Sequence, residues 1–272
     1  MRLYIFALSA LLCSITGFGQ HKSQPITIGE TVTLHSEILQ QERKLNIYLP
    51  QGYSPDSIKR YPVLYLLDGS MHEDFIHVSG LTQFASFSWI NMMPECIVVG
   101  IANTDRYHDF TSPCDKKEYK EIIENNGGSE DFTSFLEKEV QPFIDQNYKT
   151  TKSKTLIGQS LGGLLATEIL FKHPDLFDNY LIVSPSLWWD DQSLLETTPL
   201  PYTSDKSVYV AVGNEGKVMK KVARKLYSKL KKVSPETTSV YFRYFPELDH
   251  GDALHQSVYY GVKKIFYPEK RD

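Results

Sequence analysis

Residues 155–163 read Thr-Leu-Ile-Gly-Gln-Ser-Leu-Gly-Gly, and an apolar stretch continues from there to Phe171. A serine with a glycine two residues before and two residues after it is typical of a nucleophile elbow, in which a strand turns sharply at the serine and a helix follows. The apolar run before Gly158 predicts that strand, and the later run predicts the helix. The flanking glycines leave room for a strained turn, so Ser160 is the candidate nucleophile.

The remaining pattern indicates an α/β fold in one domain. Two opening strands are expected over 31–39 and 44–49, joined by a polar turn at 40–42. Further apolar runs predict strands at 61–67, 96–101, 180–183, 207–212 and 239–245. Helical spacing predicts helices at 75–89, 129–148 (capped by Ser129), 164–171, 216–232 and 253–266, and a long polar loop at 103–128. Alternating strands and helices imply a mostly parallel central sheet with helices on both faces, with chemistry beyond the carboxyl ends of the strands.

The first twenty residues differ from the rest of the chain. A positive Arg2 precedes an uncharged, mostly apolar run, and small residues follow at 17–19. This pattern predicts a secretory signal peptide over 1–20, a folded domain over 21–272, and a periplasmic or secreted protein. Two alternatives are a membrane anchor, for which the run is short, and lipid attachment at Cys13, for which the preceding Leu12 is bulky.

The composition of the chain argues against some classes of binding partner. The chain has 272 residues, 41% of them hydrophobic and 23% charged, as in soluble globular proteins, and a net charge of -4. That charge gives no reason to expect a nucleic acid or an anionic membrane as partner, and no later segment is apolar enough to span a membrane. Cys96 and Cys114 either form a disulfide or stay as buried thiols, and neither has metal-site spacing.

A serine nucleophile needs a base, and the base needs an acid. In α/β-hydrolases the chain order is serine, acid, histidine. Three histidines follow Ser160: His173 at the end of the elbow helix, His255 inside the last helix, and His250 just after the last strand, where the base is required. His250 is therefore the predicted base.

The acid is expected after the preceding strand, where Glu215 is the ionisable residue. Asp190 and Asp191, which follow an earlier strand, are the main competitors. Asp249 adjoins His250 in the backbone, so its carboxylate is expected to point elsewhere. A purely structural role for Glu215 would be capping the lysine-rich helix that follows it.

Two backbone amides should hold the oxyanion of an acyl-transfer intermediate. One is the amide of Leu161, directly after the nucleophile. The other is expected in the loop after the strand at 61–67, at Ser70 or, as the alternative, at Met71. Asp68 is expected to shape this turn.

Other residues at the same end of the sheet are candidates for substrate binding. Met71 and His72 are expected at the mouth of the site; His72 and His77 are five positions apart, which does not fit a zinc-protease helix. Arg106 is predicted either to clamp an anionic substrate or to pair with Asp105 or Asp109. The side chains of Trp188 and Trp189 are expected to form an aromatic wall, with structural packing as the alternative for one of them.

Four stretches together resemble the esterase family of α/β-hydrolases that contains siderophore (enterochelin-type) esterases, feruloyl and acetyl xylan esterases, S-formylglutathione hydrolase and mycolyltransferases. The stretches are Tyr61–Gly69, Gly158–Gly163, Ser184–Trp189 and Asp249–Gly251. The resemblance covers nearly all of the chain after the signal peptide, and the siderophore esterases are the most similar branch. It implies an α/β-hydrolase fold without a large lid domain, with Ser160 as nucleophile, His250 as base and Ser70 as oxyanion donor. Family members often have Asp where Glu215 stands.

The resulting prediction is an exported serine esterase that works through an acyl-enzyme and needs no cofactor or metal. Its substrate is expected to be a siderophore lactone or an acyl or feruloyl ester of a polysaccharide. Two alternatives stay open: an acyltransferase that uses the same triad, and a catalytically silent protein that binds a ligand in the same pocket. The oligomeric state is not predicted.

Overall fold

The computed structural model describes residues 23–267 of the chain. The predicted signal peptide over 1–20, with Cys13, lies outside these residues. Within them, no helix is long and apolar enough to cross a membrane.

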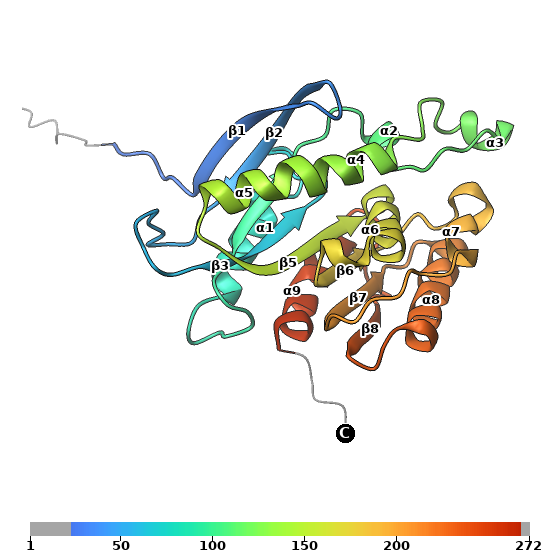
Figure 1. Cartoon of the computed structure of the whole chain (residues 1–272). Coiled ribbons are helices and arrows are strands. Elements are labelled where there is room, and N and C mark those ends of the chain that lie inside the picture. The colour runs from blue at the N-terminus through green and yellow to red at the C-terminus, as the bar shows by residue number, and fades with distance from the viewer. Residues whose placement is uncertain (1–22, 268–272) are drawn as a thin grey trace, which may run out of the picture.

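One eight-stranded sheet forms the centre of the fold (Figure 1). Its strands are β1 (Gly29–Ser36), β2 (Gln41–Tyr48), β3 (Tyr61–Leu66), β4 (Ile97–Ile101), β5 (Thr150–Gln159), β6 (Asn179–Val183), β7 (Lys206–Val212) and β8 (Thr238–Tyr244). Their order is β1-β2-β4-β3-β5-β6-β7-β8. β2 runs antiparallel to both of its neighbours, and all other pairs are parallel. The carboxyl ends of β3 to β8 therefore meet at one edge.

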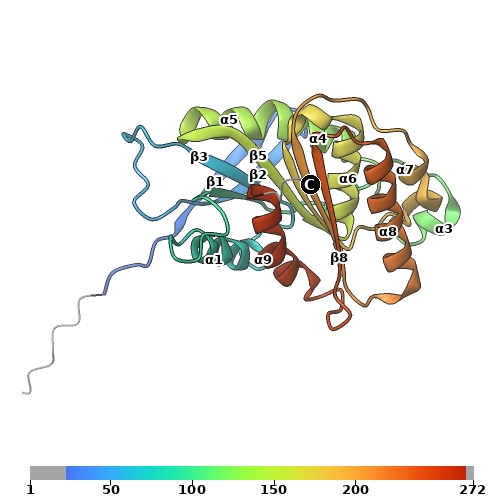
Figure 2. The same ribbon diagram turned by 90° about the horizontal axis from the view of Figure 1, so that it is seen from below.

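Helices cover both faces of the sheet, as Figure 2 shows. On one face lie α1 (Phe75–Ala85) and α9 (Ala253–Phe266). On the other lie α4 (Ser129–Phe135), the π-helical turn η1 (Leu136–Val140), α5 (Gln141–Asn147), α6 (Leu161–Lys172) and α8 (Gly216–Val233). The connections hold the short elements α2 (Arg106–Asp109), α3 (Lys117–Lys120), η2 (Pro174–Leu176), η3 (Trp189–Gln192) and α7 (Ser193–Glu196). The predicted α/β-hydrolase architecture is confirmed.

The core has two halves, one on each face of the sheet. Along β3, Val63 and Tyr65 pack into the half under α4, α6 and α8, whereas Leu64 and Leu66 pack into the half under α1 and α9. Successive side chains of a strand point to opposite faces, so a strand covered on both sides must be apolar throughout. This explains the continuous apolar runs from which the central strands were predicted.

The first hairpin differs from its prediction. β1 ends at Ser36 and β2 already begins at Gln41, so the turn occupies 37–40 and not 40–42. Glu139 of the π turn accepts hydrogen bonds from the Ser36 hydroxyl and the amide of Ile38, and Gln40 takes a left-handed φ of 52°. A distant carboxylate thus fixes this turn, and local sequence could not reveal it.

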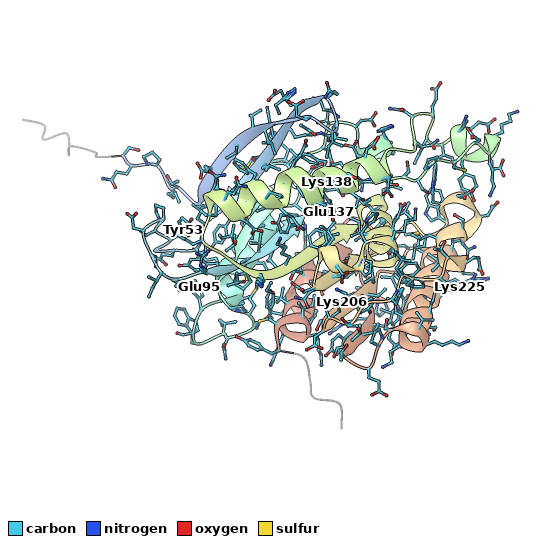
Figure 3. The ribbon with its side chains drawn as sticks, viewed as in Figure 1. Tyr53, Glu95, Glu137, Lys138, Lys206 and Lys225 are labelled. Atoms are coloured by element: carbon cyan, nitrogen blue, oxygen red, sulfur yellow. The ribbon has the colours of Figure 1, made fainter. Side chains whose placement is uncertain are left out.

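The helix predicted over 129–148 is present but is widened in its middle. Figure 3 shows Glu137 and Lys138 on the π-helical turn that joins α4 to α5. Pro142 follows this turn; it has no N–H to donate to the carbonyl of Lys138, and its ring would clash there in a regular α-helix. The widened turn removes that clash. Ser129 does not cap: Gly128 occupies the cap position, and the buried Ser129 hydroxyl has no hydrogen-bond partner in the described part of the chain.

Two further predictions can be compared with the structure. The helix predicted over 75–89 ends at Ala85, whose carbonyl accepts the amides of Met92 and Met93 as the chain turns back toward β4. Cys96 and Cys114 are buried free thiols and do not form a disulfide.

Candidate active site

Ser160 stands between the end of β5 and the start of α6, with φ 59° and ψ −119°. A residue with a side chain rarely adopts such a backbone, and its cost of about 1–3 kcal/mol is typical of functional turns. Gly158 makes the turn sterically feasible, because a Cβ there would lie 2.4 Å from the carbonyl oxygen of Gly162. The predicted elbow geometry is therefore present.

His250 and Glu215 form a hydrogen-bonded pair. Nδ1 of His250 lies 2.5 Å from Oε2 of Glu215. The Glu215 side chain is 4% exposed, whereas that of His250 is 48% exposed. An ionised carboxylate only accepts hydrogen bonds, so the imidazole proton is assigned to Nδ1, which leaves Nε2 as the acceptor that a general base requires.

The second carboxylate oxygen of Glu215 is also bonded. Oε1 accepts from the hydroxyl of Ser184 and from the amide of Gly213, the latter at 2.9 Å. Burial alone would raise the pKa of the Glu215 carboxyl, but the hydrogen bonds from His250, Ser184 and Gly213 outweigh it and hold this pKa below its usual range. Glu215 sits at the cap position of α8, yet its side chain makes no capping bond.

The competing acids are engaged elsewhere. Asp190 and Asp191 both pair with Lys116, with N–O distances of 2.7 Å in each case. Asp249 accepts the amide of Gly251 at 2.8 Å and so closes the local turn. None of these three carboxylates has a hydrogen bond to His250 among those of the described residues.

The other histidines after the elbow also have partners of their own. His173 contacts Glu130, with 3.2 Å between Nε2 and the carboxylate. His255 contacts Asp74 and stacks on His77, with 3.8 Å between ring centroids. The structure thus brings only His250 into contact with the predicted acid.

Gln159 connects the elbow to the loop of His250. Its side-chain amide donates to the carbonyl oxygen of His250 at 2.5 Å. Among the bonds of residues 23–267, none joins Ser160 to His250; the partner of the Ser160 hydroxyl is the hydroxyl of Ser186, at 3.3 Å. Apo sites often show such loose nucleophile–base geometry.

The two predicted oxyanion donors differ in whether their amides already donate a hydrogen bond. Leu161 is the first residue of α6, so its amide has no acceptor within the helix. The amide of Ser70 donates to the side chain of Glu73 at 3.2 Å. Asn103 also donates to Glu73, at 3.0 Å, and holds this carboxylate beside the turn. A substrate oxyanion would have to replace Glu73 at the Ser70 amide.

Arg106 pairs with neither of the two acids considered from the sequence. Its guanidinium forms a two-point contact with Asp68, at 2.6 and 2.9 Å, and Asn103 donates to the same carboxylate at 2.7 Å. Asp68 has a left-handed φ of 56°, as expected for a residue that shapes a turn. Arg106 Nη2 also lies 3.5 Å from the carbonyl oxygen of Gln159 in the elbow.

The other predicted binding residues differ in exposure. Met71 and His72 are exposed beside the Ser70 turn. Trp188 is half-buried and stacks on Tyr119, with ring centroids 6.4 Å apart. Trp189 is 2% exposed and donates its indole N–H to a loop carbonyl, so the packing alternative describes Trp189.

Sequence reasoning missed two residues that touch the candidate triad. Ser184 donates to Glu215, and Ser186 contacts Ser160. Both follow β6 at its carboxyl end, where polar side chains after an apolar run were a usable signal. Among residues 23–267, no group of His, Cys, Asp and Glu is arranged to hold a metal ion.

Comparison with known proteins identifies the family to which the sequence is similar. The family model described as "Putative esterase" matches residues 36–262. "Ferri-bacillibactin esterase BesA" of Bacillus subtilis is 29% identical over 194 residues, which are 65% of this chain and 65% of that protein. "Siderophore enterobactin esterase" of Emericella nidulans is 35% identical over 114 residues, 36% of this chain and 38% of that protein. The chain therefore spans less than two thirds of the length of each of these relatives.

Solved structures of other proteins have a similar fold. An IroE-like serine hydrolase from Shewanella oneidensis has 31% identity and a TM-score of 0.78, over 90% of this chain and 82% of that one. The BES protein from Bacillus cereus has 29% identity and a TM-score of 0.80, over 91% and 98% of the two chains. Because the family model covers most of the chain, the chain belongs to this esterase family, a family of ester hydrolases, and its sheet has the α/β-hydrolase fold.

Proposed function

We propose that this protein is an exported serine esterase that cleaves a carboxylic ester through an acyl-enzyme on Ser160. The observation that carries the proposal is the juxtaposition of a strained elbow with a bonded acid–base pair. Gln159, the residue before Ser160, holds the backbone of His250, and His250 in turn contacts Glu215. These are the groups that nucleophilic acyl transfer requires.

In the first half-reaction, Ser160 Oγ attacks the carbonyl carbon of the ester while Nε2 of His250 takes its proton. The amides of Leu161 and Ser70 would hold the oxyanion, with Glu73 displaced from Ser70. His250 then protonates the departing alcohol. In the second half-reaction, water repeats the attack on the acyl-enzyme, and Glu215 stabilises the imidazolium both times.

The names of the relatives favour a siderophore as the substrate, since two of them are described as esterases of bacillibactin and enterobactin. Arg106 and the partly exposed Trp188 lie among the loops that would line such a substrate. Arg106 is already paired with Asp68, so we propose that it positions the Asp68 turn and presents only its remaining N–H groups to a ligand.

The test is hydrolysis of an ester panel by wild-type protein and by Ser160→Ala. The panel holds p-nitrophenyl acetate and butyrate, methyl ferulate, acetylated xylan and a catecholate siderophore lactone. We expect serine-dependent cleavage, with the lactone as the best substrate. Preference for the xylan or the ferulate would move the substrate to a polysaccharide ester. No cleavage, but labelling of Ser160 by a fluorophosphonate, would indicate an acyltransferase; no labelling would indicate a binding protein.

Export is a separate part of the proposal and rests on residues 1–20. Cell fractionation followed by N-terminal sequencing tests it. We expect the protein outside the cytoplasm with a new N-terminus near residue 20. An intact Met1 on a cytoplasmic protein would contradict export without affecting the esterase proposal.

A further inference from the structure

The hydroxyl of Ser186 lies beside that of Ser160, with 3.3 Å between the two Oγ atoms. Ser160 follows β5 and Ser186 follows the neighbouring β6, so adjacent parallel strands bring them together. The amide of Ser186 donates to the carbonyl oxygen of Ser160 at 2.9 Å. Because backbone contacts fix both residues, the closeness of their hydroxyls is built into the fold.

Burial decides which hydroxyl donates. Ser186 is 3% exposed, and within residues 23–267 its hydroxyl has no hydrogen-bond partner other than Ser160. A buried hydroxyl proton needs an acceptor, so the donor of this contact is assigned to Ser186 and the acceptor to Ser160 Oγ. The proton of Ser160 itself then stays available to His250.

The distance indicates when this contact matters. A separation of 3.3 Å is long for an O–H···O hydrogen bond, so the resting interaction is weak. Hydrogen bonds to a charged oxygen are shorter and about twice as strong as neutral ones. The contact therefore strengthens when negative charge develops on Ser160 Oγ, and an interaction that is stronger in the transition state than in the ground state accelerates the reaction.

Charge develops on this oxygen in both half-reactions, but the ground states differ. In the free enzyme Ser186 already bonds a hydroxyl oxygen. In the acyl-enzyme, Ser160 Oγ is an ester oxygen, which is a poorer acceptor, so the gain on reaching the transition state is larger. The second half-reaction should therefore depend more on Ser186 than the first.

We propose that Ser186 is a catalytic residue that stabilises Ser160 Oγ as the leaving group during hydrolysis of the acyl-enzyme; this inference rests on the proposed serine esterase function. In that step water adds to the acyl carbonyl carbon, and His250 takes a proton from the water. The bond from carbon to Ser160 Oγ then breaks, its electron pair stays on Oγ, and His250 returns the proton to that oxygen. Ser186 donates a hydrogen bond throughout and transfers no proton.

Ser184 supplies a matched control. Its hydroxyl lies in the same turn, is 0% exposed, and donates to Oε1 of Glu215. Glu215 acts through His250, which serves both half-reactions. Removing the Ser184 hydroxyl should therefore slow both by the same factor, whereas removing that of Ser186 should slow the second more than the first.

The experiment compares wild type, Ser186→Ala and Ser184→Ala on p-nitrophenyl acetate. Single turnover with enzyme in excess reports acylation, steady-state turnover reports deacylation, and intact-protein mass spectrometry measures the acetyl-enzyme. For Ser186→Ala we expect deacylation to slow about 10- to 100-fold, the effect of losing one hydrogen bond to a charged oxygen. Acylation should slow by a smaller factor, because the free enzyme already has the weak contact to Ser160. The acetyl-enzyme fraction during turnover should rise above the wild-type level in this variant and stay at the wild-type level in Ser184→Ala.

Equal slowing of both steps in Ser186→Ala, or no slowing of either, would overturn the inference. If Ser186→Ala does not fold, Ser186→Cys retains a weak donor and should give an intermediate deacylation rate. A wild-type protein that never forms an acetyl-enzyme would instead overturn the proposed function. A wild type that forms one, with Ser186→Ala behaving identically, would overturn only the role of Ser186.

Discussion

Nδ1 of His250 lies 2.5 Å from Oε2 of Glu215, although 35 positions separate the two residues in the chain. Glu215 follows β7 and His250 follows β8, and these strands are parallel neighbours in register from Lys206 to Val212. Their carboxyl ends therefore deliver the acid and the histidine to the same edge of the sheet. The candidate site is a consequence of strand order, and each partner can be tested separately.

We expect Glu215→Gln to lower kcat about 10²- to 10⁴-fold, and His250→Ala to lower it at least about ten times further. The amide keeps the shape of the carboxylate but no longer stabilises the imidazolium that forms on His250. Steady-state hydrolysis of p-nitrophenyl acetate measures both effects. Asp190→Asn is the control, since Asp190 pairs with Lys116, and should leave kcat within about threefold of wild type. A large loss in that variant with none in Glu215→Gln would assign the acid to Asp190.

Ser160→Ala should lower turnover of the ester at least about 10⁴-fold, because no other group supplies the nucleophile. The fold should be unaffected, since alanine carries the same Cβ at the strained φ of 59°. Thermal unfolding should shift by no more than about 4 °C, which for a chain of this size corresponds to about 1 kcal/mol. Full activity in this variant would refute the serine mechanism.

The sequence predicted the central elements well, because burial leaves a clear pattern. The last helix has the predicted bounds, Ala253–Phe266, and β3 and β4 differ from their predictions by one residue. Continuous apolar runs and a periodic apolar face are the direct result of packing against both faces of the sheet. The elbow could be located because its glycines are needed by backbone geometry.

Pairings between distant side chains could not be predicted in the same way. Arg106 had acids close to it in sequence but pairs with Asp68, 38 positions away. The Ser70 amide is bonded to Glu73, and Ser186 meets Ser160 across two strands. Such contacts depend on loop conformations, such as the left-handed φ of Asp68, that hydrophobic patterning does not encode.

Gly158→Ala should destabilise the protein by about 2 kcal/mol or more. A Cβ at this position would lie 2.4 Å from a carbonyl oxygen of α6, and that backbone cannot move without shifting the elbow. Gly80→Ala is the matched control: it lies inside α1 with nothing near its added Cβ, so it should stabilise by about 0.5–1 kcal/mol. Urea unfolding measures both variants, and equal effects would contradict the close approach.

Asp109→Ala should lower the free energy of unfolding by about 3–5 kcal/mol, because it leaves the buried guanidinium of Arg43 without its counter-charge. The pair is 2.7 Å apart with side chains 0% and 2% exposed, and two further nitrogen atoms of Arg43 have no hydrogen-bond partner within residues 23–267. The exposed pair of Lys117 and Glu121 gives the comparison, and Glu121→Ala should change stability by less than about 0.5 kcal/mol. A loss below about 1 kcal/mol in Asp109→Ala would show that the buried charge finds another partner.

Lys206 provides a pH-dependent test of the core. Figure 3 shows it at the start of β7, where it is 3% exposed and donates to the carbonyl oxygen of Phe177 at 2.8 Å. Burial lowers the pKa of its amine from the ordinary value of 10.5, although Asp178 and Asp175 partly oppose the shift. Between the folded-state pKa and 10.5, the unfolded chain therefore binds more protons than the folded protein at this site.

Stability rises with pH wherever the unfolded state binds more protons. The contribution of Lys206 to the free energy of unfolding therefore becomes more favourable as the pH increases through this window. Lys206→Met removes the buried charge and should be more stable than wild type at neutral pH. Its advantage should then shrink toward pH 10.5, by at most about 1.4 kcal/mol per pH unit for a single group. Urea unfolding of both proteins at pH 7, 9 and 10 measures the difference, in which all other titrating groups cancel. A constant difference across these pH values would mean that the Lys206 amine titrates alike in the folded and unfolded states.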